Sequence, residues 1–303
     1  MFIKPDDYII IMEDNICNPL SSTDVTMLVD SGIEIVYVLR TISWENAIRN
    51  NWSNFDNAIS KYLNTDLRLL LPLDMPMPKD FPDDWYLENR TVSNYSNQDF
   101  MSALDDLIYK LIEHISDIKD RVQFTYAFPG GGEFLWDGVR PDPFPVSDEV
   151  IHKFVIDRQK ILVNQHGEIW THFHNFMGGP RNWNNTKLTF LYQALRDEFI
   201  DIPFYSIQFA HFSIGGNSPT NWECQSMITS YGEKYKIQFF VGSEYCEGMR
   251  INFDAAVKQK ARGFFTCSRH FENPVKHNSI EPWMVETIKE TNRKFREAYG
   301  SKD

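Results

Sequence analysis

The sequence predicts an α/β fold, a (β/α)8 TIM barrel that forms a single domain over residues 1–303. Short apolar runs rich in β-branched residues alternate with helical patterns along the whole chain, which is typical of a parallel sheet covered by helices. The alternation occurs eight times, the number of units that closes a barrel. The length suits one barrel, and no Gly/Ser-rich or Pro-rich linker divides the chain.

The first strand–helix–strand unit is the plainest. Residues 8–12 (Tyr-Ile-Ile-Ile-Met) form a continuous apolar run, which is typical of a strand buried on both faces. Ser22-Thr23-Asp24 supplies a cap for a helix that reaches about Ser31. The β-rich run 33–39 follows and predicts the second strand.

The next units contain a long interruption. Apolar residues at helical spacing predict a helix over 53–64, and the run 67–71 predicts the third strand. Residues 75–97 hold several Pro and aromatic residues and predict a loop, and long loops in compact chains are usually functional. A strongly amphipathic helix from 96 or 97 to about 115 leads into the fourth strand, which starts at Gln123.

The second half of the chain repeats the same alternation to its end. Strands are predicted at 169–174, 204–209, 237–241 and 263–267, and helices at 148–162, 187–199, 222–231, 253–261 and 281–299. In a barrel the carboxyl ends of all strands face one rim, where active sites are built. We therefore expect functional residues just after strand ends.

Composition excludes several classes of partner. The formal charge is −12, with 42 acidic against 30 basic residues, so the phosphates of nucleic acids or anionic membranes are expected to be repelled. The first residues carry Asp6 and Asp7 where a signal peptide has bases, and no run approaches the roughly 20 apolar residues of a membrane span. We expect a cytoplasmic protein with neither nucleic-acid nor membrane partners.

Glu133 follows the fourth predicted strand. That strand breaks into Pro129-Gly130-Gly131-Gly132, and Glu133 stands before Phe134, Leu135 and Trp136. The glycines allow a tight turn and close approach to a ligand. Apolar neighbours raise a carboxyl pKa, so Glu133 is predicted to donate a proton near neutral pH.

Glu244 follows the seventh predicted strand in a similar way. Gly242-Ser243-Glu244-Tyr245 leaves the apolar run 237–241. Glycosidic bond cleavage needs two carboxyl groups on either side of the bond, and strands four and seven lie across the mouth of a barrel. Glu244 is predicted to remain ionised, with Tyr245 beside it.

The chain resembles the glycoside hydrolases with (β/α)8 barrels, in particular the clan with catalytic glutamates at the ends of strands four and seven. Gly130-Gly131-Gly132-Glu133 with Trp136 is similar to the segment after strand four in β-galactosidase-like and β-amylase-like barrels. The resemblance implies hydrolysis of an oligosaccharide or glycoconjugate with Glu133 as acid/base and Glu244 as nucleophile. Retention of anomeric configuration is favoured over inversion, and no cofactor is expected.

Other residues near strand ends are candidates for substrate binding. Trp rings stack against sugar faces, and polar side chains hydrogen-bond sugar hydroxyl groups. The candidates are Arg40, Trp44, Asp74, Trp136, His174, Asn175, His211 and Tyr245.

Two alternatives remain open. Gly132 stands where most members of the two-glutamate clan have Asn, which favours a carbohydrate-binding barrel without catalysis. The rim residues His172, His174, His211 and His270 suggest a metal-dependent hydrolase instead. Such enzymes normally place a His pair on the first strand, which here ends in Glu13-Asp14, so we expect no metal.

Overall fold

The computed structural model describes most of the chain. The described ranges are 8–15, 19–39, 42–73, 81–87, 92–125, 146–172, 183–208, 230–243, 246–267 and 279–300. Eight of the strands in these ranges belong to one parallel sheet. They are β1 (Ile9–Asn15), β2 (Ile35–Leu39), β3 (Arg68–Pro72), β6 (Val122–Thr125), β7 (Ile169–His172), β8 (Phe204–Gln208), β9 (Ile237–Ser243) and β10 (Gly263–Cys267).

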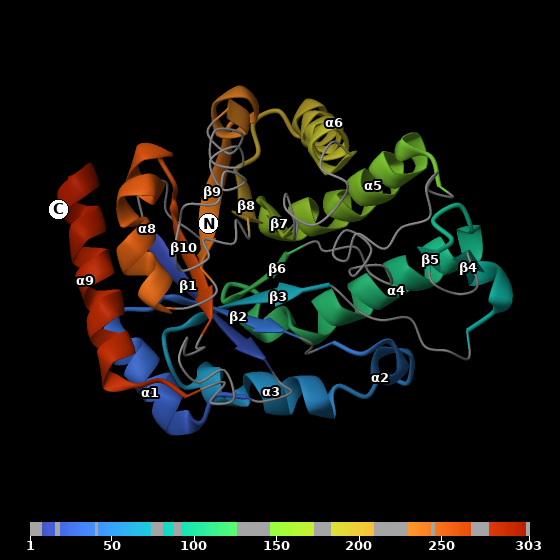
Figure 1. The fold of residues 1–303 in the computed structure, drawn as a ribbon. Coiled ribbons are helices and arrows are strands. Elements are labelled where there is room, and N and C mark those ends of the chain that lie inside the picture. The colour runs from blue at the N-terminus through green and yellow to red at the C-terminus, as the bar shows by residue number, and fades with distance from the viewer. Residues whose placement is uncertain are drawn as a thin grey trace.

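The sheet forms a nearly closed barrel. The strand order is β6-β3-β2-β1-β10-β9-β8-β7, so barrel strands that follow one another in sequence pair with each other, except β6 and β7, and the last strand pairs with the first. The two strands at the ends of this order, β6 and β7, lie against each other. Figure 1 shows the helices arranged around the outside of the strands. The predicted (β/α)8 TIM barrel is confirmed.

Helices fill the intervals between the strands. They are α1 (Ser22–Ser31), α2 (Trp44–Ile48), α3 (Ser53–Leu63), α4 (Gln98–His114), α5 (Asp148–His166), α6 (Trp183–Glu198), α8 (Cys246–Lys258) and α9 (Pro282–Tyr299). Residues 230–235 are also helical. The predicted loop 75–97 contains a short 3-10 helix, η1 (Asp83–Trp85), and an antiparallel pair, β4 (Tyr86–Leu87) and β5 (Val92–Ser93).

Several boundaries differ from the prediction, among them the end of β1 and the start of α8. β1 continues beyond Met12 through three polar residues, because Glu13 and Asp14 still pair in register with Tyr37 and Val38 of β2. α8 begins well before the predicted residue 253, although Gly and Asn are poor helix formers. The Asn252 side chain donates to the Gly248 carbonyl at 2.8 Å within this first part of the helix.

Successive residues of each strand face opposite sides of the barrel wall. Alternate side chains of the first strand, Ile10 and Met12, join the large apolar core between strands and helices. The other set points into the barrel and forms a separate buried cluster. Its members are Ile9, Ile11, Ile35, Tyr37, Leu70, Trp170, Tyr205, Ile207, Phe240 and Phe265.

The seam between β10 and β1 requires a glycine. Gly263 is the register partner of Ile9, and a Cβ built on Gly263 would lie 1.7 Å from the Ile9 carbonyl oxygen. Any side chain here would separate the two backbones. The first and last strands of the chain therefore close on each other only because residue 263 is Gly.

α5 carries a histidine that is sensitive to pH. The His166 ring meets the edge of the Phe124 ring, with centroids 5.7 Å apart, and its Nε2 has no hydrogen-bond partner within the described residues. Burial lowers the pKa of His166 from 6.5 to about 4. The unfolded chain therefore binds more protons than the folded chain between these two values, and the contribution of His166 to stability is lost as the pH falls through that window.

Lowering the pH from 7 to 5 is therefore expected to cost about 2 kcal/mol of unfolding free energy through this group. The His166→Gln variant should lack this part of the loss. Urea unfolding of both proteins at the two pH values measures it, and equal losses in the two proteins would contradict the assignment.

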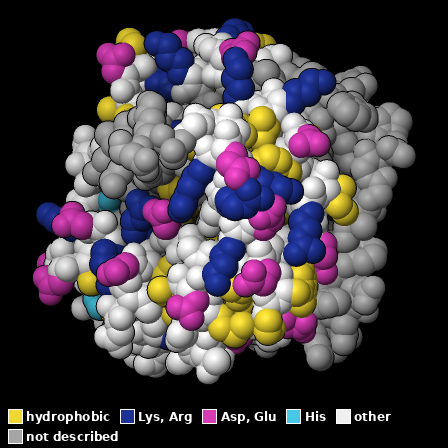
Figure 2. All heavy atoms as spheres, turned by 90° about the vertical axis from the view of Figure 1, so that its left-hand side faces the viewer, with side chains coloured by type: hydrophobic (Ala, Val, Ile, Leu, Met, Phe, Trp, Pro, Cys, Tyr) yellow, Lys and Arg dark blue, Asp and Glu magenta, His cyan; other side chains and the backbone are white. Residues whose placement is uncertain are grey.

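The surface around α9 is a solvated, mixed-charge face. Figure 2 shows Lys, Arg, Asp and Glu side chains interspersed over it. Arg293 pairs with Glu290 at 2.7 Å and also with Glu297, both on the same helix. None of the helices in the described parts of the chain is long and apolar enough to cross a membrane.

Candidate functional site

The end of β1 turns two consecutive carboxylates to opposite faces of the barrel wall. Glu13 shares the inward face with Ile9 and Ile11, and Asp14 shares the outward face with Ile10 and Met12. Both carboxylates are buried. Because burying a carboxylate is costly unless it is hydrogen-bonded or paired, each of them calls for its own explanation.

Asp14 has a structural explanation. Its Oδ1 accepts from the Leu20 backbone N–H at 2.9 Å, and its Oδ2 accepts from the Lys61 ammonium at 2.6 Å and from the Tyr62 hydroxyl. Burial, together with the Asp14 charge, holds the pKa of Tyr62 far above its usual range. The cluster joins the end of β1 to α3 and to the residues that precede α1.

Asp24 makes a second structural connection at the same end of the barrel. Its Oδ2 accepts from the Ser21 backbone N–H at 2.8 Å, which caps α1. Its Oδ1 accepts from the Ile280 backbone N–H at 2.7 Å, just before α9. The connections that follow the first and last strands are thereby tied together next to the barrel mouth.

The inward face of the first, second and fourth strands carries three buried polar side chains, Glu13, Tyr37 and Thr125, which we name the mouth cluster. Glu13 and Tyr37 are register partners on β1 and β2. The Thr125 hydroxyl donates to the Tyr37 hydroxyl oxygen at 3.5 Å, across the intervening β3. Gln123, two residues before Thr125, is also buried, and its Nε2 has no partner among the described residues.

The opposite half of the interior is aromatic. The Trp170 ring stacks on Tyr205 with centroids 4.7 Å apart and on Phe240 at 5.6 Å. Its indole N–H donates to the Glu168 carboxylate at 3.2 Å, at the amino end of β7. These rings fill the part of the barrel interior that lies on the amino-terminal side of the mouth cluster. The interior is thus a packed aromatic and aliphatic plug, with the mouth cluster towards the carboxyl ends of the strands.

The two predicted catalytic glutamates lie outside the described residues. β6 ends at Thr125, so Glu133 follows the fourth barrel strand along the chain, and β9 ends at Ser243, so Glu244 is the next residue after the seventh. Most of the other predicted site residues also lie outside the described ranges: Arg40, Asp74, Trp136, His174, Asn175, His211 and Tyr245. Their roles stay predictions.

Trp44 is the predicted binding residue that the structure describes. It opens α2, is only 1% exposed, and belongs to the core between strands and helices. Phe100 of α4 stacks against the ring, with centroids 6.1 Å apart, and Phe81 meets it at right angles. In the structure the Trp44 ring packs between α2 and α4, which contact each other. Contact of Trp44 with a substrate stays an untested prediction.

The described part of the chain includes only one of the four histidines on which the metal alternative depends. His172 is the last residue of β7, and His174, His211 and His270 lie outside the described ranges. Within those ranges no three His, Cys, Asp or Glu side chains lie close enough together to bind a metal ion.

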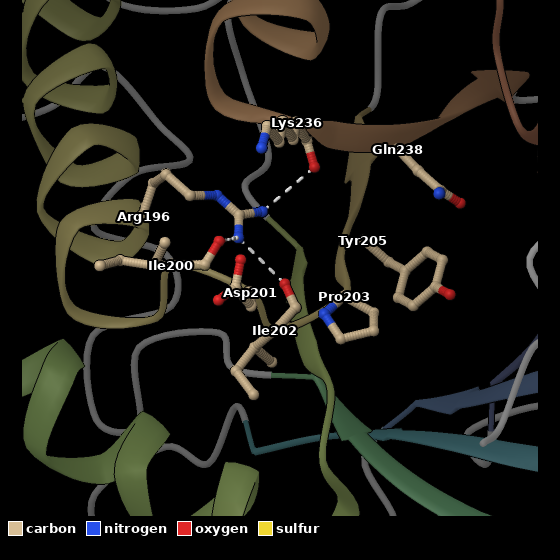
Figure 3. A pocket seen from close by; sticks show the side chains of 8 residues that line it. All are labelled: Arg196, Ile200, Asp201, Ile202, Pro203, Tyr205, Lys236 and Gln238. Carbon is tan, nitrogen blue, oxygen red and sulfur yellow. Dashed lines mark hydrogen bonds between the residues drawn. The ribbon is translucent and has the colours of Figure 1, made fainter.

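A pocket of about 310 Å³ lies at the other end of the barrel from the mouth cluster (Figure 3). Its walls are the end of α6, the turn 200–203 and the first residues of β8 and β9. Arg196 spans this region, and its guanidinium donates to five backbone carbonyl groups: Phe199, Ile200, Ile202, Tyr235 and Lys236. Contacts at the amino ends of barrel strands stabilise the fold, whereas catalysis uses the opposite rim.

Comparison with known proteins identifies the fold. No family model and no curated protein sequence matches the chain. Among solved structures, a glycoside hydrolase family 30 subfamily 8 xylanase from Clostridium acetobutylicum aligns with a TM-score of 0.57 at 9% identity, over 95% of this chain and 71% of that one.

Two further structures have the same architecture. The spore cortex-lytic enzyme SleL of Bacillus megaterium QM B1551 aligns with a TM-score of 0.55 at 10% identity, over 95% of this chain and 75% of that one. A psychrophilic glycoside hydrolase family 10 endo-β-1,4-xylanase aligns at 0.53 and 10%, over 93% and 96%. At these identities the likeness concerns the fold, and the chain shares its (β/α)8 barrel with these three enzymes.

Proposed function

We propose that the chain is a single-domain glycoside hydrolase that cleaves a glycosidic bond with Glu133 as general acid/base and Glu244 as nucleophile. The supporting observation is the position of β6 and β9 as the fourth and seventh strands of the barrel. Glu133 and Glu244 follow these two strands in the sequence, and parallel strands end at the same rim. Three proteins with the same fold are enzymes, two of them xylanases and one a spore cortex-lytic enzyme.

The reaction proceeds in two displacements. Glu244 attacks the anomeric carbon while Glu133 gives its proton to the leaving glycosidic oxygen, and a covalent glycosyl–enzyme ester forms. Glu133, now ionised, then takes a proton from water, which attacks the same carbon and releases Glu244. Two inversions give net retention of configuration.

The substrate class is an oligosaccharide or glycoconjugate. A neutral sugar needs no compensating positive charge, which suits a chain with a formal charge of −12. The mouth cluster offers a carboxylate and two hydroxyl groups, and these are the groups that hydrogen-bond sugar hydroxyls.

A panel of p-nitrophenyl glycosides tests this function. We expect release of p-nitrophenol from at least one of them, and we expect NMR spectra of the early reaction to show the product sugar in the anomeric configuration of the substrate. A product that first appears inverted would contradict Glu244 as nucleophile. Absence of turnover across the panel would contradict the hydrolase.

A second candidate is a carbohydrate-binding barrel without catalysis. Gly132 favours it, since most members of the clan that the chain resembles have Asn before the acid/base. Calorimetric titration with the same glycosides distinguishes the two functions, because binding without turnover would support this candidate.

A further inference from the structure

The pocket at the amino end of the barrel is a cavity that the proposed function leaves unused. Its volume of about 310 Å³ lies within the range of small-molecule sites. It opens between the turn 200–203 and the start of β9, at the opposite end of the barrel from the strand ends that precede Glu133 and Glu244. A ligand held here would therefore not compete with a substrate at the barrel mouth.

Arg196 fixes the walls of this pocket. The carbonyl groups that its guanidinium binds belong to the residues after α6, the turn before β8 and the residues before β9. One of them is the carbonyl of Lys236, at 3.1 Å (Figure 3). Lys236 has a φ of 53°, a conformation that is uncommon outside glycine and that clusters at ligand sites when the surrounding structure holds it. The pocket is thus preformed.

Three polar side chains that line the pocket have no hydrogen-bond partner within the described part of the chain. They are the Lys236 ammonium, the Asp201 carboxylate and the buried Gln238 Oε1. Burial lowers the pKa of Arg196, and the charge of Asp201 partly offsets this, so the carboxylate lies near the guanidinium. The last torsion of a Gln side chain is soft, so the Gln238 amide turns towards a donor in the pocket at little cost.

The remaining lining is largely aliphatic. Ile200, Ile202 and Pro203 all belong to the turn before β8, and Ile200 is 66% exposed. Covering such a side chain with an apolar group removes both surfaces from water, which is favourable. The pocket thus combines an apolar wall with one unpaired positive and one unpaired negative charge.

We propose that this pocket binds a small zwitterion, a free α-amino acid with an apolar side chain. The carboxylate of the ligand pairs with the Lys236 ammonium, and its own ammonium group donates to the Asp201 carboxylate and the Gln238 amide oxygen. Its side chain covers the aliphatic wall at Ile200. An anion alone would meet the charge of Asp201 and a cation alone that of Lys236, so a ligand with both charges matches the lining. Binding here does not depend on hydrolysis at the other rim.

Isothermal titration calorimetry with L-leucine and L-phenylalanine tests the site. Each amino acid is compared with its deaminated acid and with its methyl ester, which carry one charge each. We expect at least one of the two amino acids to bind with a dissociation constant of about 0.1 to 1 mM, at least about tenfold more tightly than its one-charge analogues. At ten times that concentration the ligand should raise the thermal midpoint by about 2 to 4 °C.

Variants assign the two charges. Lys236→Met should weaken binding of the amino acid at least about tenfold without weakening that of the methyl ester, which lacks the carboxylate. Asp201→Asn should weaken binding of the amino acid and the ester, but not that of the deaminated acid. Lys260→Met is the matched control, because Lys260 has a similar φ of 55° and pairs with Glu233 on the surface before β10. This variant should bind like the wild type.

Three results would overturn the site. They are no binding of either amino acid at about 10 mM, wild-type affinity for the amino acid in both Lys236→Met and Asp201→Asn, and binding of D-glucose or inorganic phosphate in place of the amino acids. Both residues are exposed, so folded variants are expected, and Lys236→Gln removes the charge if Lys236→Met does not fold. Because calorimetry measures binding alone, loss of the glycoside hydrolase proposal would leave this site standing, and the reverse also holds.

Discussion

Replacing Glu133 or Glu244 with glutamine is expected to lower kcat/KM for the best p-nitrophenyl glycoside by at least about 10³-fold. Glutamine keeps the size of the side chain but neither donates a proton as an acid nor attacks as a carboxylate. The thermal midpoint should stay within error of the wild type, because the substitution removes proton donation or nucleophilic attack and keeps the size of the side chain. Steady-state kinetics with circular dichroism melting measure both quantities.

The control is Glu113→Gln, the same substitution at an exposed position of α4, which should keep full activity.

Azide distinguishes the nucleophile from the acid/base. In Glu244→Ala it attacks from the side that the nucleophile leaves free and gives a glycosyl azide of inverted configuration. In Glu133→Ala it takes the place of water on the glycosyl–enzyme and gives the retained product. Wild-type activity in either glutamine variant would end the assignment of that residue.

Replacing Arg196 with methionine is expected to reduce the free energy of unfolding by about 2 to 4 kcal/mol. Methionine fills a similar volume but leaves carbonyl groups of three segments without their donor: the end of α6, the turn before β8 and the residues before β9. Arg196→Lys should restore only part of the stability, because an ammonium group has fewer donors than the guanidinium fork. Urea unfolding at constant pH measures these differences.

Arg293→Met serves as the control for Arg196→Met. Arg293 also forms several ion pairs, but it lies on the solvated face of α9, where such pairs contribute little. Its loss should leave the urea midpoint unchanged. An Arg196→Met variant as stable as the wild type would show that water satisfies the five carbonyl groups equally well.

The fold was predictable because strands of a barrel are buried on both faces. Such strands are continuous apolar runs, and β10 (Gly263–Cys267) matches its predicted range at both ends. Polar strand ends are harder, because a pattern of apolar residues stops where β1 still pairs with β2 through Glu13 and Asp14. The start of α8 was not predicted because Gly and Asn have weak helix propensity, which the hydrogen bond from Asn252 to the Gly248 carbonyl offsets.

The candidate site was less predictable than the fold. Motifs drew attention to glutamates beside glycines and tryptophans, whereas Glu13 follows an apolar run and belongs to no motif. The signal that would have found it is the alternation of Ile9, Ile11 and Glu13, which places all three on one face. Trp44 is buried in the structure, and its position after a strand end does not by itself tell whether the ring faces solvent or the helix beside it.

The glycine seam has a consequence for biosynthesis. Among the eight barrel strands β1 is made first and its partner β10 last, so one edge of the Ile9–Asn15 strand has no partner in the nascent chain until the other seven strands have been made. An apolar strand with an open edge is a template for intermolecular pairing. A longer time between the synthesis of β1 and that of β10 is therefore expected to lower the yield of folded protein.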